Sequence, residues 1–138
     1  MPVLYLIYSV SLFSVKVDIK LASIQICIYG VKVMTREVVE ISEAIRLAVQ
    51  AERIYLFGSH AYGTPNKDSD LDFFIVIPDE GMKPLEAIRH ARFALIPLNR
   101  KTSVDILADY RSRFDQRSKL NTLERTIANE GVLLYERA

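Results

Sequence analysis

The sequence predicts an α/β (α+β) fold, in which a small mixed β-sheet is flanked by helices. Three observations support this fold class. Short apolar runs of strand length alternate with segments whose apolar residues recur at helical spacing. Gly58 and Pro78 end two of these runs, as residues that interrupt regular structure do. The 138 residues are enough for one hydrophobic core but not for two, so we expect one domain.

The expected elements follow in chain order from residue 35. Thr35 can cap a helix that ends near residue 50, because apolar residues recur from Val38 to Val49 at helical spacing. Pro84 suits the first turn of a second helix. Strands are expected over residues 53–57, 71–77, 103–107 and 132–135, and further helices over 84–95 and 110–130, the last broken near Ser118.

Residues 1–33 differ from the rest of the chain. They begin with an apolar run, but Lys16 and Asp18 interrupt it before the roughly 20 residues that a membrane span needs. No basic segment precedes the run, which argues against a secretory signal, and residues 15–21 alternate as a strand does. Two interpretations stand: an upstream start that precedes the true first residue, Met34, or a β-prone N-terminal extension. We expect the functional domain over residues 34–138.

The composition argues against several classes of function. A formal net charge of +1 gives no broad basic field for nucleic acid. The single cysteine, Cys27, cannot form an internal disulfide, and there is no Cys/His cluster with zinc spacing. We therefore expect a cytoplasmic protein that does not bind membranes.

Three carboxylates are the first candidates for a functional site. Asp70 and Asp72 lie two residues apart at the start of an apolar strand, so both side chains point to one face. Two like charges this close repel, and a divalent cation such as Mg²⁺ relieves the repulsion. Asp105 lies in another apolar strand and can face the same site if the two strands are neighbours. Three carboxylates on adjacent strands would hold two metal ions, as in nucleotidyl transfer.

Gly58 and Ser59 follow the first strand directly. Glycine allows close approach of the backbone to a ligand, and N–H groups at a turn can bind phosphate oxygens. A nucleoside triphosphate that bridges this turn and the carboxylates is therefore the predicted ligand. Each feature alone also has an ordinary explanation. Gly-Ser is a common turn, Asp68 to Asp70 could serve as loop and cap residues, and Asp105 could be an edge residue or a salt-bridge partner.

The order of these residues resembles the signature of the polymerase-β-like nucleotidyltransferases. Gly58-Ser59 is followed, after ten residues, by Asp70-Leu71-Asp72. The longer string, with His60 to Gly63 after the turn and Ser69 before the carboxylates, resembles their minimal (MNT) type, which includes antitoxins paired with HEPN toxins. The resemblance spans about residues 35–138.

The resemblance implies a palm-like nucleotidyltransferase core, Mg²⁺ (two ions) and ATP as substrate. By match to the motif, Asp70 and Asp72 would be metal ligands and catalytic residues. Asp105 would be the third carboxylate, which binds metal and helps to deprotonate the acceptor hydroxyl. Gly58 and Ser59 would hold the triphosphate.

The activity implied most specifically is that of an antitoxin which transfers AMP from ATP to a hydroxyl, a tyrosine, on a small helical HEPN-type partner encoded nearby. The chain has no room for the acceptor-holding domain of larger nucleotidyltransferases. The acceptor must bring its own binding surface, or a second copy of the chain in a homo-oligomer must complete the site. Two alternatives stay open: nucleotidyl transfer to a small molecule such as an aminoglycoside, and a non-catalytic module that masks a partner.

Overall fold

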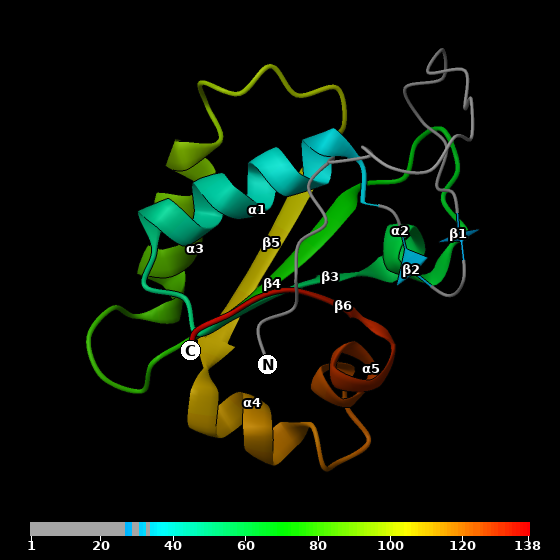
Figure 1. Cartoon of the computed structure of the whole chain (residues 1–138). Coiled ribbons are helices and arrows are strands. Elements are labelled where there is room, and N and C mark those ends of the chain that lie inside the picture. The colour runs from blue at the N-terminus through cyan, green and yellow to red at the C-terminus, as the bar shows by residue number, and fades with distance from the viewer. Residues whose placement is uncertain (1–26, 29–30, 33) are drawn as a thin grey trace.

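The computed structural model describes residues 27–28, 31–32 and 34–138, and its centre is a mixed sheet in the order β5-β4-β3-β6 (Figure 1). β3 pairs antiparallel with β4 and with β6, whereas β4 and β5 are parallel. The predicted small mixed sheet is confirmed. Its strands are β3 (Arg53–Phe57), β4 (Leu71–Ile77), β5 (Val104–Tyr110) and β6 (Val132–Glu136).

Helices cover both faces of this sheet (Figure 1). On one face, Phe73 and Ile75 of β4 belong to a core that includes buried residues of α1 and α3. On the other face, Phe74 and Val76 pack in a second core with α4 and α5. This division follows from β4 itself, because successive strand residues point to opposite faces. The covering helices are α1 (Arg36–Ala48), α3 (Pro84–Ala94), α4 (Arg111–Arg117) and α5 (Leu123–Glu130).

Most predicted elements from residue 35 onward are confirmed. The Thr35 hydroxyl oxygen accepts a hydrogen bond from the Val38 N–H at 3.3 Å and caps α1. Ser118 ends α4, which confirms the predicted break. β5 extends to Tyr110, beyond the expected end at Leu107, because it stays in register with β4 as far as the pair Ile77–Tyr110.

One short helix differs from the expectation, and two short strands lie within residues 1–33, for which a β-prone extension was one of the two interpretations. A helix, α2 (Gly58–Tyr62), begins directly after β3, where only a turn and a loop were expected. β1 (Cys27–Ile28) and β2 (Val31–Lys32) form an antiparallel pair. The strand predicted over residues 15–21 lies outside the described residues. Among the helices described, none has both the length and the hydropathy needed to cross a membrane.

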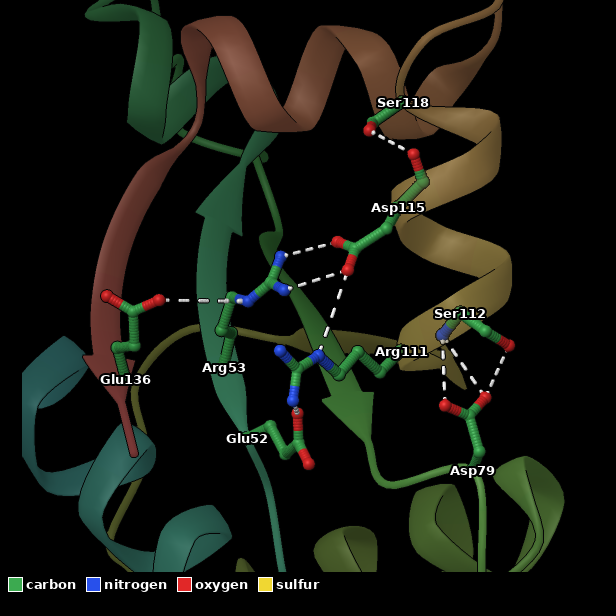
Figure 2. Close-up of polar contacts among 8 residues, drawn as sticks. All are labelled: Glu52, Arg53, Asp79, Arg111, Ser112, Asp115, Ser118 and Glu136. Carbon is green, nitrogen blue, oxygen red and sulfur yellow. Dashed lines mark hydrogen bonds and ion pairs between the residues drawn. The ribbon is translucent and has the colours of Figure 1, made fainter. Parts of the chain in front are cut away.

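A network of charges fixes α4 to the start of β3 (Figure 2). Arg53 donates two hydrogen bonds to Asp115 of α4, at 2.9 and 3.3 Å, and lies 3.8 Å from the carboxylate of Glu136 on β6. Arg111 forms a further ion pair with Glu52 at 3.2 Å. The Arg53 side chain is only 17% exposed, so its charge is compensated where solvent screens it poorly.

Candidate active site

The predicted site residues come together at one end of the sheet. β3 ends where the antiparallel strand β4 begins, and β5 begins at the same end because it runs parallel to β4. The register pairs Phe57 with Asp72, and Asp72 with Asp105. Neighbouring strands lie about 4.8 Å apart and paired residues share a face, so Asp72 and Asp105 are side by side. The condition under which Asp105 could face the same site, that the two strands are neighbours, is therefore met.

Residues on this face form three rows across β3, β4 and β5. The middle row packs under Phe114 of α4, whose ring lies 5.5 Å from that of Tyr55 and 5.3 Å from that of Phe74. The same row ends at Leu107, which is 41% exposed, so cover by the helices decreases toward β5. The rows are Phe57-Asp72-Asp105, Tyr55-Phe74-Leu107 and Arg53-Val76-Asp109. The row that contains Asp72 and Asp105, the carboxylate row, therefore lies beside the aromatic row, and its last residue, Asp105, is exposed.

Gly58 brings the backbone against the Asp72 carboxylate. Its φ of +72° lies in the left-handed region that favours glycine, and a Cβ at this position would be 2.2 Å from Asp72 Oδ2. Gly58 and Ser59 also begin α2, and the first N–H groups of a helix have no partners within the helix. This turn therefore puts hydrogen-bond donors beside Asp72.

Three contacts fix the chain where β4 begins. The Ser103 hydroxyl donates a hydrogen bond to Asp70 Oδ1, and the Ser103 carbonyl accepts one from the Leu71 N–H at 2.9 Å. The His60 ring nitrogen Nε2 lies 3.2 Å from the Ser69 carbonyl oxygen. Ser103 is not among the site residues predicted from the sequence. Its position two residues before Asp105 was the available sequence signal, whereas the pairing of β5 with β4 that brings it to Asp70 was not.

Burial and mutual repulsion of the carboxylates determine the electrostatics of the site. Burial raises the pKa of Asp72 above its ordinary value, repulsion from Asp105 and then from Asp70 raises it further, and His60 lowers it. Within residues 34–138, none of the three aspartates forms an ion pair with a Lys or Arg side chain. Binding a cation would remove this repulsion.

The donor chemistry fits Mg²⁺, although the three side chains do not converge. In the part of the chain that the structure describes, no three His, Cys, Asp or Glu side chains form a group placed to hold a metal ion. Asp70 is hydrogen-bonded to Ser103, while Asp72 and Asp105 are paired in register. Carboxylate oxygens at repelling positions are the ligands that Mg²⁺ prefers. The assignment of Asp70, Asp72 and Asp105 to a metal site stays a prediction that this chemistry supports.

Comparison with known proteins gives a family and a fold. The nucleotidyltransferase domain family matches residues 36–133. No curated protein matches the chain. A Sulfolobus solfataricus protein, described only provisionally as a nucleotidyltransferase, has a similar structure with a TM-score of 0.51 and 20% identity, over 74% of this chain and 79% of that chain. At this identity the likeness shows a shared fold.

Two toxin–antitoxin structures are less similar. One contains AMP-PNP and has a TM-score of 0.45 and 21% identity, over 74% of each chain. The other, a mutant of MntA–HpeT, has a TM-score of 0.48 and 22% identity, over 71% of this chain and 72% of that chain. Neither likeness is close enough to carry an argument about this chain.

Proposed function

Because this chain belongs to the nucleotidyltransferase domain family, we propose that it is a Mg²⁺-dependent enzyme that transfers AMP from ATP to a tyrosine hydroxyl of a small helical, HEPN-type protein. The family membership supports nucleotidyl transfer, and the resemblance of the motif to minimal antitoxins supports the acceptor. One observation carries the proposal: Asp72 is paired with Asp105 on one side and lies against Gly58 on the other. A triphosphate-binding turn and a metal-binding pair would therefore be adjacent.

Each residue has a distinct role in this reaction. The turn at Gly58 and Ser59 would bind triphosphate oxygens through N–H groups and the Ser59 hydroxyl. Asp70, Asp72 and Asp105 would hold Mg²⁺, which when bound neutralises phosphate charge and stabilises the leaving pyrophosphate. Asp105, the outermost of the row, would accept the proton of the acceptor hydroxyl. The acceptor oxygen would bond to the α-phosphorus as the bond to the β-phosphate oxygen breaks, so that pyrophosphate leaves.

The surroundings of Asp105 favour a protein acceptor. Asp105 is exposed on the end strand of the sheet, where a large partner can reach it. A surface hollow lined by residues that include Ile77 and Met82 lies at the far end of β4 from Asp72, so it is not an acceptor pocket for this site. An acceptor that brings its own binding surface fits this geometry better than a small molecule does.

Labelled transfer tests the proposal. The purified chain is incubated with Mg²⁺, ATP labelled at the α-phosphate, and the purified product of the adjacent gene. We expect label on a tyrosine of that protein. Label on an added aminoglycoside instead would favour the small-molecule alternative, and a stable complex without label would favour a masking module.

Asp105→Asn separates catalysis from nucleotide binding. We expect the transfer rate to fall at least about 100-fold while ATP affinity stays within a few-fold, because Asp70, Asp72 and the Gly58 turn still hold the nucleotide. Asp109→Asn is the matched control, since Asp109 lies on the same strand and face but pairs with Arg113 at 3.2 Å. A transfer rate unchanged in the Asp105 variant would remove this residue from the site.

A further inference from the structure

We propose that the outer edge of β5 receives an extended segment of the acceptor protein as an added strand, which places a hydroxyl-bearing side chain beside Asp105. The inference rests on the proposed function and adds the way in which the acceptor is recognised. β5 is the end strand of the sheet order β5-β4-β3-β6. In the described part of the chain, no other strand pairs with its outer side.

The register shows which backbone groups of β5 face outward. The Leu71 N–H donates to the Ser103 carbonyl, so Ser103 turns its backbone toward β4. Backbone direction alternates along a parallel ladder, so every second residue of β5 turns its N–H and C=O away from β4. Within residues 34–138 the outward groups of Val104, Ile106 and Ala108 have no hydrogen-bond partner. The N–H of Tyr110, the last outward residue, donates to Asp109 Oδ1 at 2.9 Å.

The two edges of the sheet differ in how they are protected. The pairing of β3 with β6, the other end strand, shifts register between Ile54 and Tyr55. β5, by contrast, pairs with β4 over all 7 of its residues without a shift. Proteins protect edge strands with bulges, prolines and charged side chains, lysines especially. β5 contains no bulge, proline or lysine, and of its two charged residues Asp109 is paired with Arg113 and Asp105 belongs to the carboxylate row. A long and regular edge of this kind can accept an added strand.

The rows of side chains across the sheet predict which side chains an added strand would place beside β5. The first row ends at Asp105, so the next position in that row lies about 4.8 Å away, on the added strand. A side chain there would share the face of Asp72 and Asp105. The second row ends at the partly exposed Leu107, which an apolar side chain two positions along the added strand would cover. The segment recognised would therefore contain a hydroxyl residue and an apolar residue separated by one position.

Amide hydrogen exchange of the full-length, ¹⁵N-labelled chain tests strand addition directly. The probe is the purified product of the adjacent gene, at saturating concentration with Mg²⁺. We expect exchange at the Ile106 and Ala108 amides to slow at least about tenfold, because a new ladder bond must open before exchange. Amides of β6 should not change.

A proline variant adds a kinetic test. Ala108→Pro removes an outward N–H that β4 does not use, and proline is tolerated on edge strands where the N–H faces solvent. We expect KM for the partner protein to rise about tenfold with kcat and ATP affinity unchanged, whereas the control Ala108→Val should behave as the parent. Should the proline variant not fold, exchange in the parent chain decides.

The outcomes separate this inference from the proposed function. AMP transfer to the partner without protection of Ile106 and Ala108 would overturn strand addition and leave the proposed function intact. Protection without transfer would keep strand addition and contradict the proposed function. Absence of both would overturn both.

Discussion

The two ends of one face of the sheet differ in whether their charged side chains form ion pairs. At the end where β3 begins, Arg53 is bound to Asp115 and Glu136 (Figure 2). At the end where β4 begins, Asp72 and Asp105 are neighbours, and no Lys or Arg side chain in residues 34–138 pairs with either. An aromatic layer of Tyr55 and Phe74 separates the two ends.

This difference distinguishes structural charges from functional ones. Buried or half-buried charges cost free energy unless they are paired. The charges that connect α4 to β3, Arg53 and Asp115, are paired with each other. The raised pKa of Asp72, caused by burial and by repulsion from Asp105 and Asp70, shows the cost of leaving the other end unpaired. A carboxylate with a raised pKa beside an exposed one supports the proposed site for a cation and its substrate.

Removing one charge from each end should have opposite consequences, and the largest effect should be on activity. We expect Asp72→Asn to lower AMP transfer by about 1,000-fold, because it would remove a proposed metal ligand, and such a ligand contributes several kcal/mol in the transition state. Its melting temperature should be equal or higher, since the repulsion with Asp105 is relieved. Single-turnover transfer and thermal melts measure both. Transfer near the parent rate would remove Asp72 from the metal site.

Substitution of two glycines, Gly58 and Gly63, tests the nucleotide-binding turn at the carboxylate end of the sheet. Gly58→Ala should destabilise the fold by about 1–3 kcal/mol and weaken ATP binding, because alanine at positive φ is strained and its Cβ would meet Asp72. Gly63→Ala, at φ +80° with no atom within 4 Å of its Cβ, should show the strain alone and bind ATP normally. Calorimetric titration with Mg²⁺ and ATP, together with urea unfolding, distinguishes them. Equal ATP affinity in the two variants would contradict a nucleotide-binding role for the Gly58 turn.

At the paired end, we expect Asp115→Asn to reduce the free energy of unfolding by about 1 kcal/mol, because Arg53 loses a charged acceptor that is itself partly exposed. The transfer rate per folded molecule should stay at the parent value. Urea unfolding and active-site-normalised kinetics test this. A large loss of rate without a loss of stability would show that the two ends are not independent.

The smallest expected effect on stability concerns Glu37, a carboxylate that accepts hydrogen bonds from Lys101 and Thr102. Burial raises the pKa of Glu37, but hydrogen bonds from Thr102 and Lys101 outweigh burial and lower this pKa below its ordinary value. A lowered pKa means that Glu37 stabilises the fold above about pH 4.5 and that this contribution is lost as the pH falls through the folded value. Glu37→Gln should cost less than about 1 kcal/mol at neutral pH, with the difference shrinking in acid. Urea unfolding of both chains from pH 7 to pH 3 measures it, and a difference that grew in acid would contradict it.

The sequence predicted the parts of the fold that depend on local pattern. The helical spacing of apolar residues from Val38 to Val49 predicted α1, and the apolar run over residues 71–77 predicted β4. The helix α2 could not be predicted in this way, because its five residues carry no apolar period and it begins at a glycine with positive φ. β5 continued through Asp109 because pairing with β4 outweighs the loss of apolar alternation.

The candidate site was predictable as a set of residues but not as an arrangement. Asp105 could be a neighbour of Asp72 only if β5 lay next to β4, and strand order is a property of the whole fold. The hydrogen bond from Ser103 to Asp70 depends on the same pairing, since it joins residues far apart in the chain. No local pattern contains that information.

Calorimetric titration of ATP into the purified chain, with and without Mg²⁺, tests the central claim that the unpaired carboxylates are reserved for a cation and its nucleotide. The account predicts ATP binding that requires Mg²⁺, that is lost in Asp72→Asn, and that is retained in Asp115→Asn. ATP binding that is equally strong without Mg²⁺, or unchanged in Asp72→Asn, would contradict it.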